Sequence, residues 1–146
     1  MAQGFRLQPL LDLTDHRLDA ATLELQRLRA RLEQEQARYA QLQGFDAEYR
    51  AGFQSALQAG LEADRLRDYR EFLDKLSRAL TAQAEEVARC QRVWEEGLAR
   101  WQDLKQRQQA LTVLRNRHAA EHARREARVE QKQQDEFARR PPRRQG

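Results

Sequence analysis

The feature that most constrains this fold is a stretch of about 130 residues, from 10 to 140, that contains no proline. Proline breaks a helix in its interior and glycine weakens one, yet this stretch holds only four glycines. Ala, Glu, Lys, Leu and Arg supply more than half of the 146 residues, which is a composition typical of long helices. The sequence therefore predicts an all-α protein of one or two long helices, without a compact multilayer core.

Two interleaved series of mostly apolar residues, each with a spacing of seven, predict which face of the first helix is buried. One series is Leu11, Leu18, Leu25, Leu32 and Tyr39. The other is Thr14, Ala21, Leu28, Glu35, Leu42 and Tyr49. These are the a and d positions of a coiled coil, where the side chains of two helices interlock along a seam.

The same spacing returns after residue 65 and predicts a second helix. Its a positions are Leu66, Leu73, Leu80, Val87, Trp94 and Trp101. Its d positions are Tyr69, Leu76, Gln83, Cys90, Gly97, Leu104 and Leu111. Most of the stability must come from this seam, because each large apolar side chain buried there contributes roughly 1.5–3 kcal/mol. The polar seam residues Glu35, Asp46 and Gln83 are expected to weaken the coil locally, as residues that fix register often do.

The segment between the two patterns, AGFQSALQAGLEAD, contains two glycines and is predicted to reverse the chain, with Asp64 capping the second helix. We therefore expect one coiled-coil domain over residues 1–146. It comprises a helix over about 10–51, a tip over 52–64, a helix over about 65–140 and a basic, proline-containing tail over 141–146. The predicted fold is a long antiparallel two-helix coiled-coil hairpin with a longer second helix.

The register of the hairpin is predicted from the position of this tip. Residues whose numbers sum to about 115 should face each other, so that an a residue meets a d residue. This sets large side chains against small ones in Ala21 with Trp94, Thr14 with Trp101 and Leu18 with Gly97, and it sets Leu42 against Leu73. Leu111 would then face residue 4, and the second helix would have no partner beyond about residue 114.

The terminal composition and the single cysteine, Cys90, bear on the cellular compartment. The first ten residues lack the charged head and apolar run of a signal peptide, and no segment approaches the roughly 20 apolar residues of a membrane span. One cysteine excludes an intramolecular disulfide. We expect a cytoplasmic protein in which Cys90 is a small core residue.

The second half of the chain resembles the flagellar type III export protein family FliJ. The resemblance rests on the runs RDYREFLDKLSRAL, RVWEEGLARWQDLKQRQQAL and, most specifically, RVEQKQQDEFARR. A weaker, collinear match in the first half includes LQGFDAEYR. The resemblance implies a non-enzymatic stalk-like component of the flagellar type III export apparatus, peripherally associated with the inner membrane. It also implies three kinds of partner: the hexameric export ATPase FliI, the cytoplasmic domain of the export gate protein FlhA, and flagellar export chaperones.

The resemblance further implies an export-gate binding patch. The matching positions are Leu42, Phe45, Tyr49, Phe72, Leu76 and Ala79. Arg38 and Gln83 stand where the family pattern has Gln and His, and Phe45 replaces a Tyr. From the heptad pattern alone, Phe72 and Ala79 fall at g positions and widen the apolar stripe beyond what two helices need, although Phe72 could simply cover the seam edge.

The segment after residue 115 carries the whole excess of positive charge, with nine basic and five acidic side chains. Because it lacks a partner helix and contains the most family-specific run, it is the candidate ATPase-binding segment. The residues assigned to this contact are Arg128, Lys132, Asp135, Glu136, Phe137 and Arg139. For the basic tail beyond them, a flexible solubilising end, a contact with an acidic protein surface and a contact with nucleic acid all remain open.

Catalytic and metal signals are weak. His118, Glu121 and His122 spell the H-x-x-E-H motif of some zinc proteases, but the sequence offers no third ligand or walled pocket, so a solvated helix face is predicted. Gly-rich phosphate loops are absent from the sequence. We therefore expect no enzyme activity, cofactor, metal or small-molecule substrate. The alternatives are the equivalent stalk of a virulence type III secretion system and a basic coiled-coil protein that binds nucleic acid.

Overall fold

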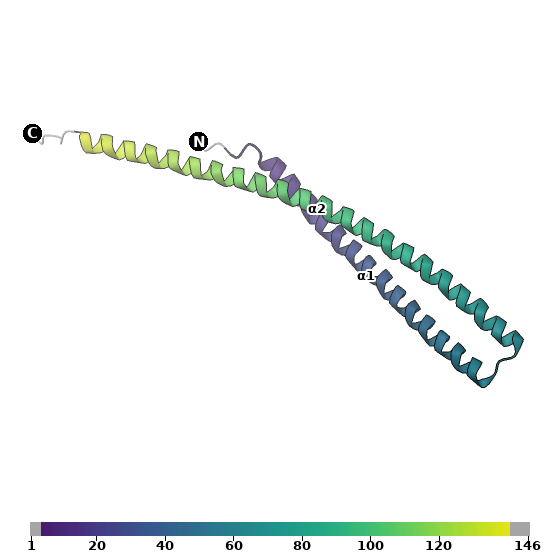
Figure 1. Cartoon of the computed structure of the whole chain (residues 1–146). Coiled ribbons are helices and arrows are strands. Elements are labelled where there is room, and N and C mark those ends of the chain that lie inside the picture. Colours follow the sequence, from purple (N-terminus) through teal and green to yellow (C-terminus); the bar gives the residue numbers. More distant parts are fainter. Residues whose placement is uncertain (1–3, 141–146) are drawn as a thin grey trace, which may run out of the picture. The chain divides into compact units, whose positions relative to one another are not determined.

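The computed structural model describes residues 4–140, and nearly all of them lie in two helices (Figure 1). Helix α1 spans Gln8–Ala59 and helix α2 spans Ala63–Arg139, which makes them 52 and 77 residues long. The predicted all-α hairpin with a longer second helix is confirmed. The basic tail predicted over 141–146 lies outside the described residues.

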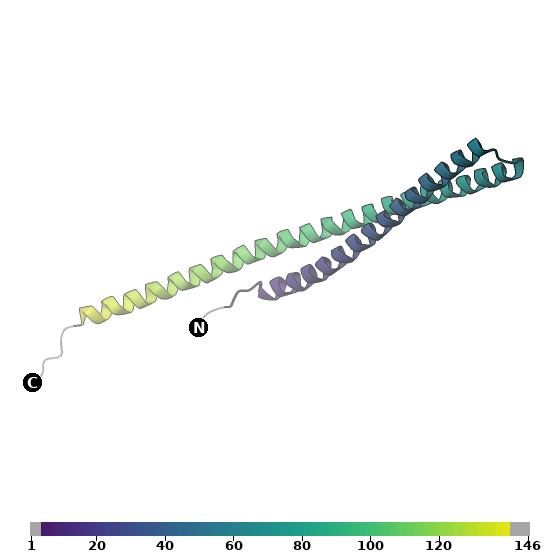
Figure 2. The same cartoon turned by 90° about the horizontal axis from the view of Figure 1, so that it is seen from below.

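The chain divides into two compact units. Unit 1 joins the residues up to Asp19 with those from Asp103 onward, and unit 2 comprises Ala20–Gln102. In unit 2, α1 and α2 lie side by side and antiparallel on either side of the turn, as both views show (Figures 1 and 2). The assignment of the chain to a single domain stays a prediction.

Helix α1 begins two residues earlier than predicted, because proline is tolerated in the first turn. The amide of Leu11 donates to the carbonyl of Leu7 at 3.0 Å, which starts the helix just before Gln8. Pro9 therefore occupies the second helical position, where a backbone donor is not required. The side chain of Gln8 adds a hydrogen bond to Asp12, one turn later, at 2.9 Å.

The reversal is much shorter than the predicted tip over 52–64. Helix α1 continues through Gly52 to Ala59, and Gly60 ends it with a φ of 91°, a conformation that glycine adopts without a Cβ clash. Glu62 accepts the first hydrogen bond of α2, from the amide of Leu66 at 3.0 Å. Asp64 is thus not the predicted cap; it lies inside the first turn, where its charge favours the helix dipole.

The seam predicted from the heptad pattern is the buried face of the helices. In unit 2 the buried side chains include Leu28, Leu32, Leu73, Leu76 and Cys90, all at a or d positions. In unit 1 the buried residues Leu11, Thr14, Leu18 and Leu111 belong to the same series. The periodicity therefore identified the correct face, except at Tyr49, which belongs to the d series but is 37% exposed.

The predicted register is wrong by one heptad. In unit 2, Trp101 Nε1 donates to Thr22 Oγ1 at 2.9 Å, and the rings of Phe53 and Tyr69 lie 5.3 Å apart. Arg29, not Ala21, packs against Trp94, with its guanidinium 5.1 Å from the ring centroid. The numbers in these pairs sum to about 122 rather than 115. The reason is the longer α1, which moves the point of reversal about three residues along the chain.

Unit 1 follows the corrected register. Gln108 Nε2 donates to Asp15 Oδ1 at 2.7 Å, and the rings of Phe5 and His118 lie 5.8 Å apart. Leu111 therefore does not face residue 4, and pairing extends to His118 instead of ending near residue 114. His122 is half-buried, whereas every residue from 123 to 140 is exposed. At 1.5 Å per residue, this exposed helix to Arg139 measures about 25 Å.

Candidate docking surfaces

An apolar groove opens on unit 2, near the turn. It has a volume of about 310 Å³ and takes side chains from both helices. Its walls are Phe45, Glu48, Tyr49 and Gly52 from α1 and Tyr69, Phe72 and Leu76 from α2. Four of the six predicted export-gate residues therefore meet in one groove, although they come from segments more than twenty residues apart in sequence.

The aromatic rings of this groove support one another. Tyr49 stacks at a tilt on Phe72, with centroids 4.1 Å apart, and lies 5.4 Å from Tyr69. Phe72 nevertheless remains 41% exposed and Phe45 50% exposed. One face of Phe72 covers the seam edge while another stays accessible, so the structure is compatible with both interpretations of this residue.

Two predicted members lie outside the groove wall. Leu42 is half-buried in the seam, and Ala79 is exposed on α2. Conversely, Glu48, Gly52 and Tyr69 line the groove without having been predicted. Tyr69 was already in the d series, and Gly52 was misinterpreted as a helix end; within α1 it leaves open space beside the rings.

Two of the three positions that depart from the family pattern, Arg38 and Gln83, are joined through one buried carboxylate. Gln83 Nε2 donates to Glu35 Oε2 at 2.7 Å and to the Glu35 carbonyl at 2.9 Å. Arg38 and Arg31 contact Glu35 Oε1 at 3.2 and 3.3 Å. Glu35 is only 1% exposed, so these donors satisfy a charge that would otherwise be costly to bury. In this chain the side chains of Arg38 and Gln83 thus bind Glu35 within the coil.

Charged side chains outside the seam form local pairs. The guanidinium of Arg89 donates to Glu86 and holds the pKa of that carboxyl below its usual value, with a further contribution from Arg31 at 3.5 Å. The Arg27 guanidinium lowers the pKa of Glu24 in the same way. The buried Cys90 thiol lies 3.7 Å from Glu86, which agrees with its predicted role as a small core residue.

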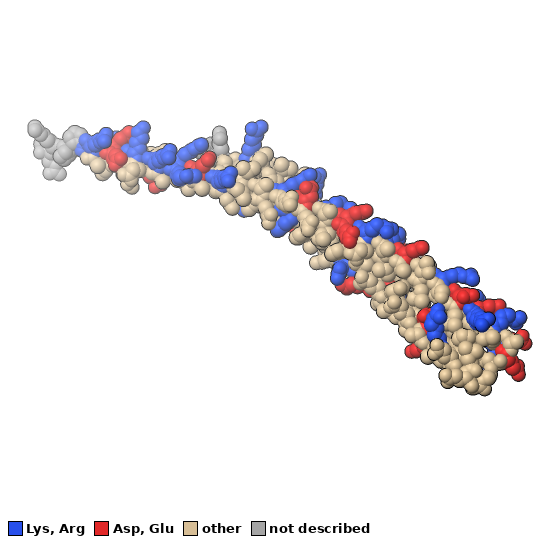
Figure 3. Space-filling model, viewed as in Figure 1, with Lys and Arg blue, Asp and Glu red and all other residues tan. Residues whose placement is uncertain are grey.

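The predicted ATPase-binding residues lie on the exposed part of α2. All six are exposed, and Phe137 is the most accessible large apolar side chain at 76%. A shallow hollow of about 280 Å³ beside it is lined by Glu130, Gln133, Gln134 and Phe137. Both signs of charge appear along this stretch of α2 (Figure 3). The segment presents isolated apolar groups within a charged helix surface.

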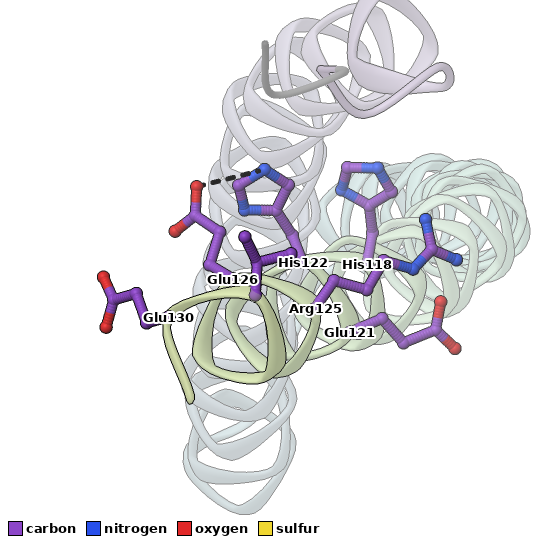
Figure 4. A pocket seen from close by; sticks show the side chains of 7 residues that line it. His118, Glu121, His122, Arg125, Glu126 and Glu130 are labelled. Carbon is purple, nitrogen blue, oxygen red and sulfur yellow. Dashed lines mark ion pairs between the residues drawn. The ribbon is translucent and has the colours of Figure 1, made fainter. Parts of the chain in front are cut away.

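The H-x-x-E-H segment forms one wall of an open hollow of about 860 Å³ on α2 (Figure 4). His118 packs against Phe5, and His122 Nε2 lies 3.6 Å from Glu126 Oε1. Glu121 points away from both imidazoles (Figure 4). Within residues 4–140 no three His, Cys, Asp or Glu side chains come together in a way that could hold a metal ion. The histidines therefore have local partners instead of a shared ligand.

Together these features define an antiparallel two-helix coiled-coil protein whose accessible surfaces are an aromatic groove and an unpaired charged helix. Residues 3–146 match the family described as "Flagellar FliJ protein". The chain belongs to this FliJ family of flagellar export proteins.

Two relatives of known family agree with this assignment. The flagellar FliJ proteins of Escherichia coli strain K12 and Salmonella typhi are each 29% identical to this chain over 140 residues. Each alignment covers 96% of this chain and 95% of the relative. The similarity thus extends over both helices and the turn.

A solved structure supports the fold independently. A protein from Chlamydia trachomatis, described as a YscO homologue, matches with a TM-score of 0.58 and 18% identity, covering 93% of each chain. At this identity the likeness concerns the fold alone. Among the described residues, neither helix is long and apolar enough to cross a membrane.

Proposed function

We propose that this chain is a stalk-like adaptor of the flagellar type III export apparatus, which links the hexameric ATPase FliI to the cytoplasmic domain of the gate protein FlhA. It also escorts unloaded export chaperones. Its action is positional, without catalysis of its own, and takes place in the cytoplasm at the inner-membrane export apparatus. Family membership supports the export role in general, and the separate surfaces of the two units support a linking role.

The observation that carries the proposal is the groove in which Phe45, Tyr49, Phe72 and Leu76 meet. Aromatic side chains that remain partly exposed around a pocket are typical anchors of protein interfaces. Because the rings already pack on one another, they lose little conformational freedom when a partner binds. The groove is the contact that we assign to the gate protein.

The exposed part of α2 is the contact that we assign to the ATPase. From residue 123 onward the helix buries no side chain, so it gains little from tertiary packing. Insertion into the central opening of a hexameric ring would supply the missing contacts. Phe137 offers the largest apolar area for this purpose, and Arg128, Lys132 and Arg139 offer charge.

The test is a crossed binding experiment with purified FliI and the FlhA cytoplasmic domain. Phe72→Ala should weaken gate binding by about tenfold or more, as expected for an interface anchor, and leave ATPase binding unchanged. Removal of residues 123–146 should have the opposite effect and barely change thermal melting. Phe137→Ala should reproduce the ATPase defect in part.

Leu73→Ala is the matched control for Phe72→Ala. Leu73 is buried in the seam, so its loss should cost about 2–5 kcal/mol of stability, or less in a thin two-helix core. If Phe72→Ala unfolds the chain as severely as Leu73→Ala, Phe72 is a core residue and not a binding residue. If one variant weakens binding of both FliI and FlhA, the assignment of the two partners to separate surfaces is wrong.

The nucleic-acid alternative has less support, because the exposed aromatic groove has no role in it. Salt-sensitive retention of the full chain on DNA, together with failure to bind FliI, would favour it. The virulence-stalk alternative predicts binding to a secretion ATPase of that system in preference to FliI.

A further inference from the structure

We propose that one flank of unit 1 is a docking site for a partner's amphipathic helix that carries acidic residues. The flank, which we call the leucine–arginine flank, consists of g and c heptad positions on both helices. These positions include Leu10, Leu13, Arg17, Arg107, Leu114 and Arg117, and also Asp103, which pairs with Arg107. It is separate from the aromatic groove of unit 2 and from the exposed stretch of α2 after residue 122, so it goes beyond the proposed function.

The leucines of this flank are unusually accessible for a coil that already has a complete seam. Leu10, Leu13 and Leu114 are 46%, 44% and 43% exposed, while Leu11 and Leu111 in the adjacent seam are buried. In an antiparallel pair the g positions of both helices border the same side of the seam. Leu10 and Leu114 therefore contribute to one apolar strip along the coil.

The other flank of unit 1 has a different chemistry. Its e and b positions on α1 hold Asp12, Asp15 and Asp19, and on α2 they hold Lys105, Thr112 and Asn116. Asp12 and Asp15 already accept hydrogen bonds from Gln8 and Gln108. Leu10, Leu13 and Leu114 thus lie on one side of the seam, as on a surface that a partner covers, while Val113, which is 47% exposed, lies at an f position on the outer face of α2.

The charges of the leucine–arginine flank indicate the character of this partner. In unit 2, the g residue Glu24 lies near the opposing g residue Arg100, whose charge adds to that of Arg27 in lowering the pKa of Glu24. The numbers of the pair Glu24 and Arg100 sum to 124, and the same sum places Arg17 opposite Arg107 in unit 1, so two like charges face each other. Arg107 has an ion pair with Asp103, but neither Arg17 nor Arg117 has one within the described residues. Acidic groups from outside would remove this repulsion.

A helix is the occupant that fits this arrangement. Leu10 and Leu13 are one turn apart on α1, and Leu114 belongs to α2, so a third helix lying along the coil could pack its apolar stripe against all three. Asp or Glu residues beside that stripe would reach Arg17 and Arg107. Apolar residues at flanking heptad positions are the feature by which two-helix coils accept a third helix.

The experiment measures binding of the full chain to a fluorescent peptide of about 21 residues, the length of three heptads, with Leu at a and d and Glu at e and g. A matched peptide with Lys in place of Glu is the control. We expect the acidic peptide to bind at least about tenfold more tightly than the basic one, with an affinity that falls as salt rises.

Two variants test the site itself. L10N/L114N should weaken binding by about tenfold or more, whereas Leu23→Asn, at a leucine that is 68% exposed in unit 2, should have no effect. Arg17→Glu should also weaken binding, yet raise the melting temperature, because it turns a like-charged g pair into an opposite one. Arg92→Glu, at an exposed f position without an ion pair in the described chain, should change neither quantity.

Several outcomes would overturn the proposal. Equal binding of the acidic and basic peptides, or undiminished binding by L10N/L114N, would remove the site. A dimer of the full chain that L10N/L114N converts to monomer would assign the flank to a second copy. Retention on anionic phosphatidylserine vesicles that is lost in L10N/L114N, without peptide binding, would assign it to a lipid surface. By contrast, peptide binding by a chain that does not bind FliI or FlhA would contradict only the proposed function and would support this site.

Discussion

At Gly97 of unit 2, side chains of α1 pack so closely against α2 that they leave no room for a methyl group. A Cβ at Gly97 would lie 2.8 Å from Leu28 Cδ1 and 3.8 Å from Leu25 Cδ1, whereas nothing lies within 4 Å of a Cβ at Gly44. Both glycines are inside helices, so alanine gains about 1 kcal/mol of helix propensity at either site. The space around each glycine therefore decides whether alanine stabilises the protein at that position.

We expect Gly44→Ala to raise the free energy of unfolding by about 1 kcal/mol. Gly97→Ala should give no such gain, because displacing the buried Leu28 costs about 1–3 kcal/mol. Urea denaturation followed by circular dichroism measures both. A stabilisation by Gly97→Ala equal to that of Gly44→Ala would show that the helices are free to separate at this point.

The pair of Glu86 and Arg89 predicts a pH dependence. The folded-state pKa of Glu86 is lowered below 4.5 chiefly by the hydrogen bond from Arg89, so the pair stabilises the fold above that pH and ceases to do so as the pH falls through the lowered pKa. Arg89→Gln should therefore lower the melting temperature at pH 7 but not near pH 2. Arg92→Gln, which breaks no ion pair in the described residues, should have the same small effect at both. If Arg89→Gln lowers the melting temperature equally at both pH values, the ion pair with Glu86 is not the source of the stabilisation.

At the scale of the helices, the sequence predicted the buried face but not the register. A seam with a spacing of seven is degenerate, because sliding one helix by a heptad again brings every a position opposite a d position. Only the turn removes this ambiguity. Phe53 and Ala56 continue the a and d series beyond Gly52 and are half-buried, and this continuation was the signal that α1 extends to Ala59.

The residues of the candidate site, like the packing of the helices, were predicted only in part. Phe45, Tyr49, Phe72 and Leu76 came from a family resemblance that needs no register. Gly52 was missed because the predicted helix ended at residue 51, and Glu48, although inside that helix, was marked by neither the heptad pattern nor the resemblance. The position of Gly52 follows from where the chain reverses, which heptad spacing does not encode.

Engineered cross-links test the corrected register. With Cys90 replaced by Ser, cysteines at Phe53 and Tyr69 should form a disulfide or a short bismaleimide bridge within one chain, since their rings are 5.3 Å apart. Cysteines at Ala21 and Trp94 belong to the register shifted by a heptad and should not. Efficient bridging of only the second pair would restore the register with sums of about 115.

At the scale of the whole molecule, the two units differ in the number of residues that they pair. Unit 2 pairs 40 residues of α1 with the first 40 of α2, whereas unit 1 offers only 12 residues of α1 as a partner. Helices gain most of their stability from such packing. The stretch of α2 from 123 to 139 has no packing of this kind.

Hydrogen exchange should therefore show three levels of protection. Amides in the paired helices of unit 2 should exchange slowest, those of residues 8–19 faster, and those of 123–139 fastest. Adding FliI should slow the last group selectively if the proposed contact is correct. Uniform exchange along α2 would show that the helix unfolds as one unit.

The three-residue turn has a consequence for how such a chain can change in length. Because each residue of α1 is matched to one whose number completes a sum of about 122, an insertion of seven residues in α1 alone would keep a positions opposite d positions but would exchange the partner of every residue on one side of it, and so separate pairs such as Thr22 and Trp101. The original pairs are restored only when α2 gains seven residues on the opposite side of Gly60. Lengthening or shortening of the hairpin that keeps these pairs should thus be inherited as matched pairs of heptads.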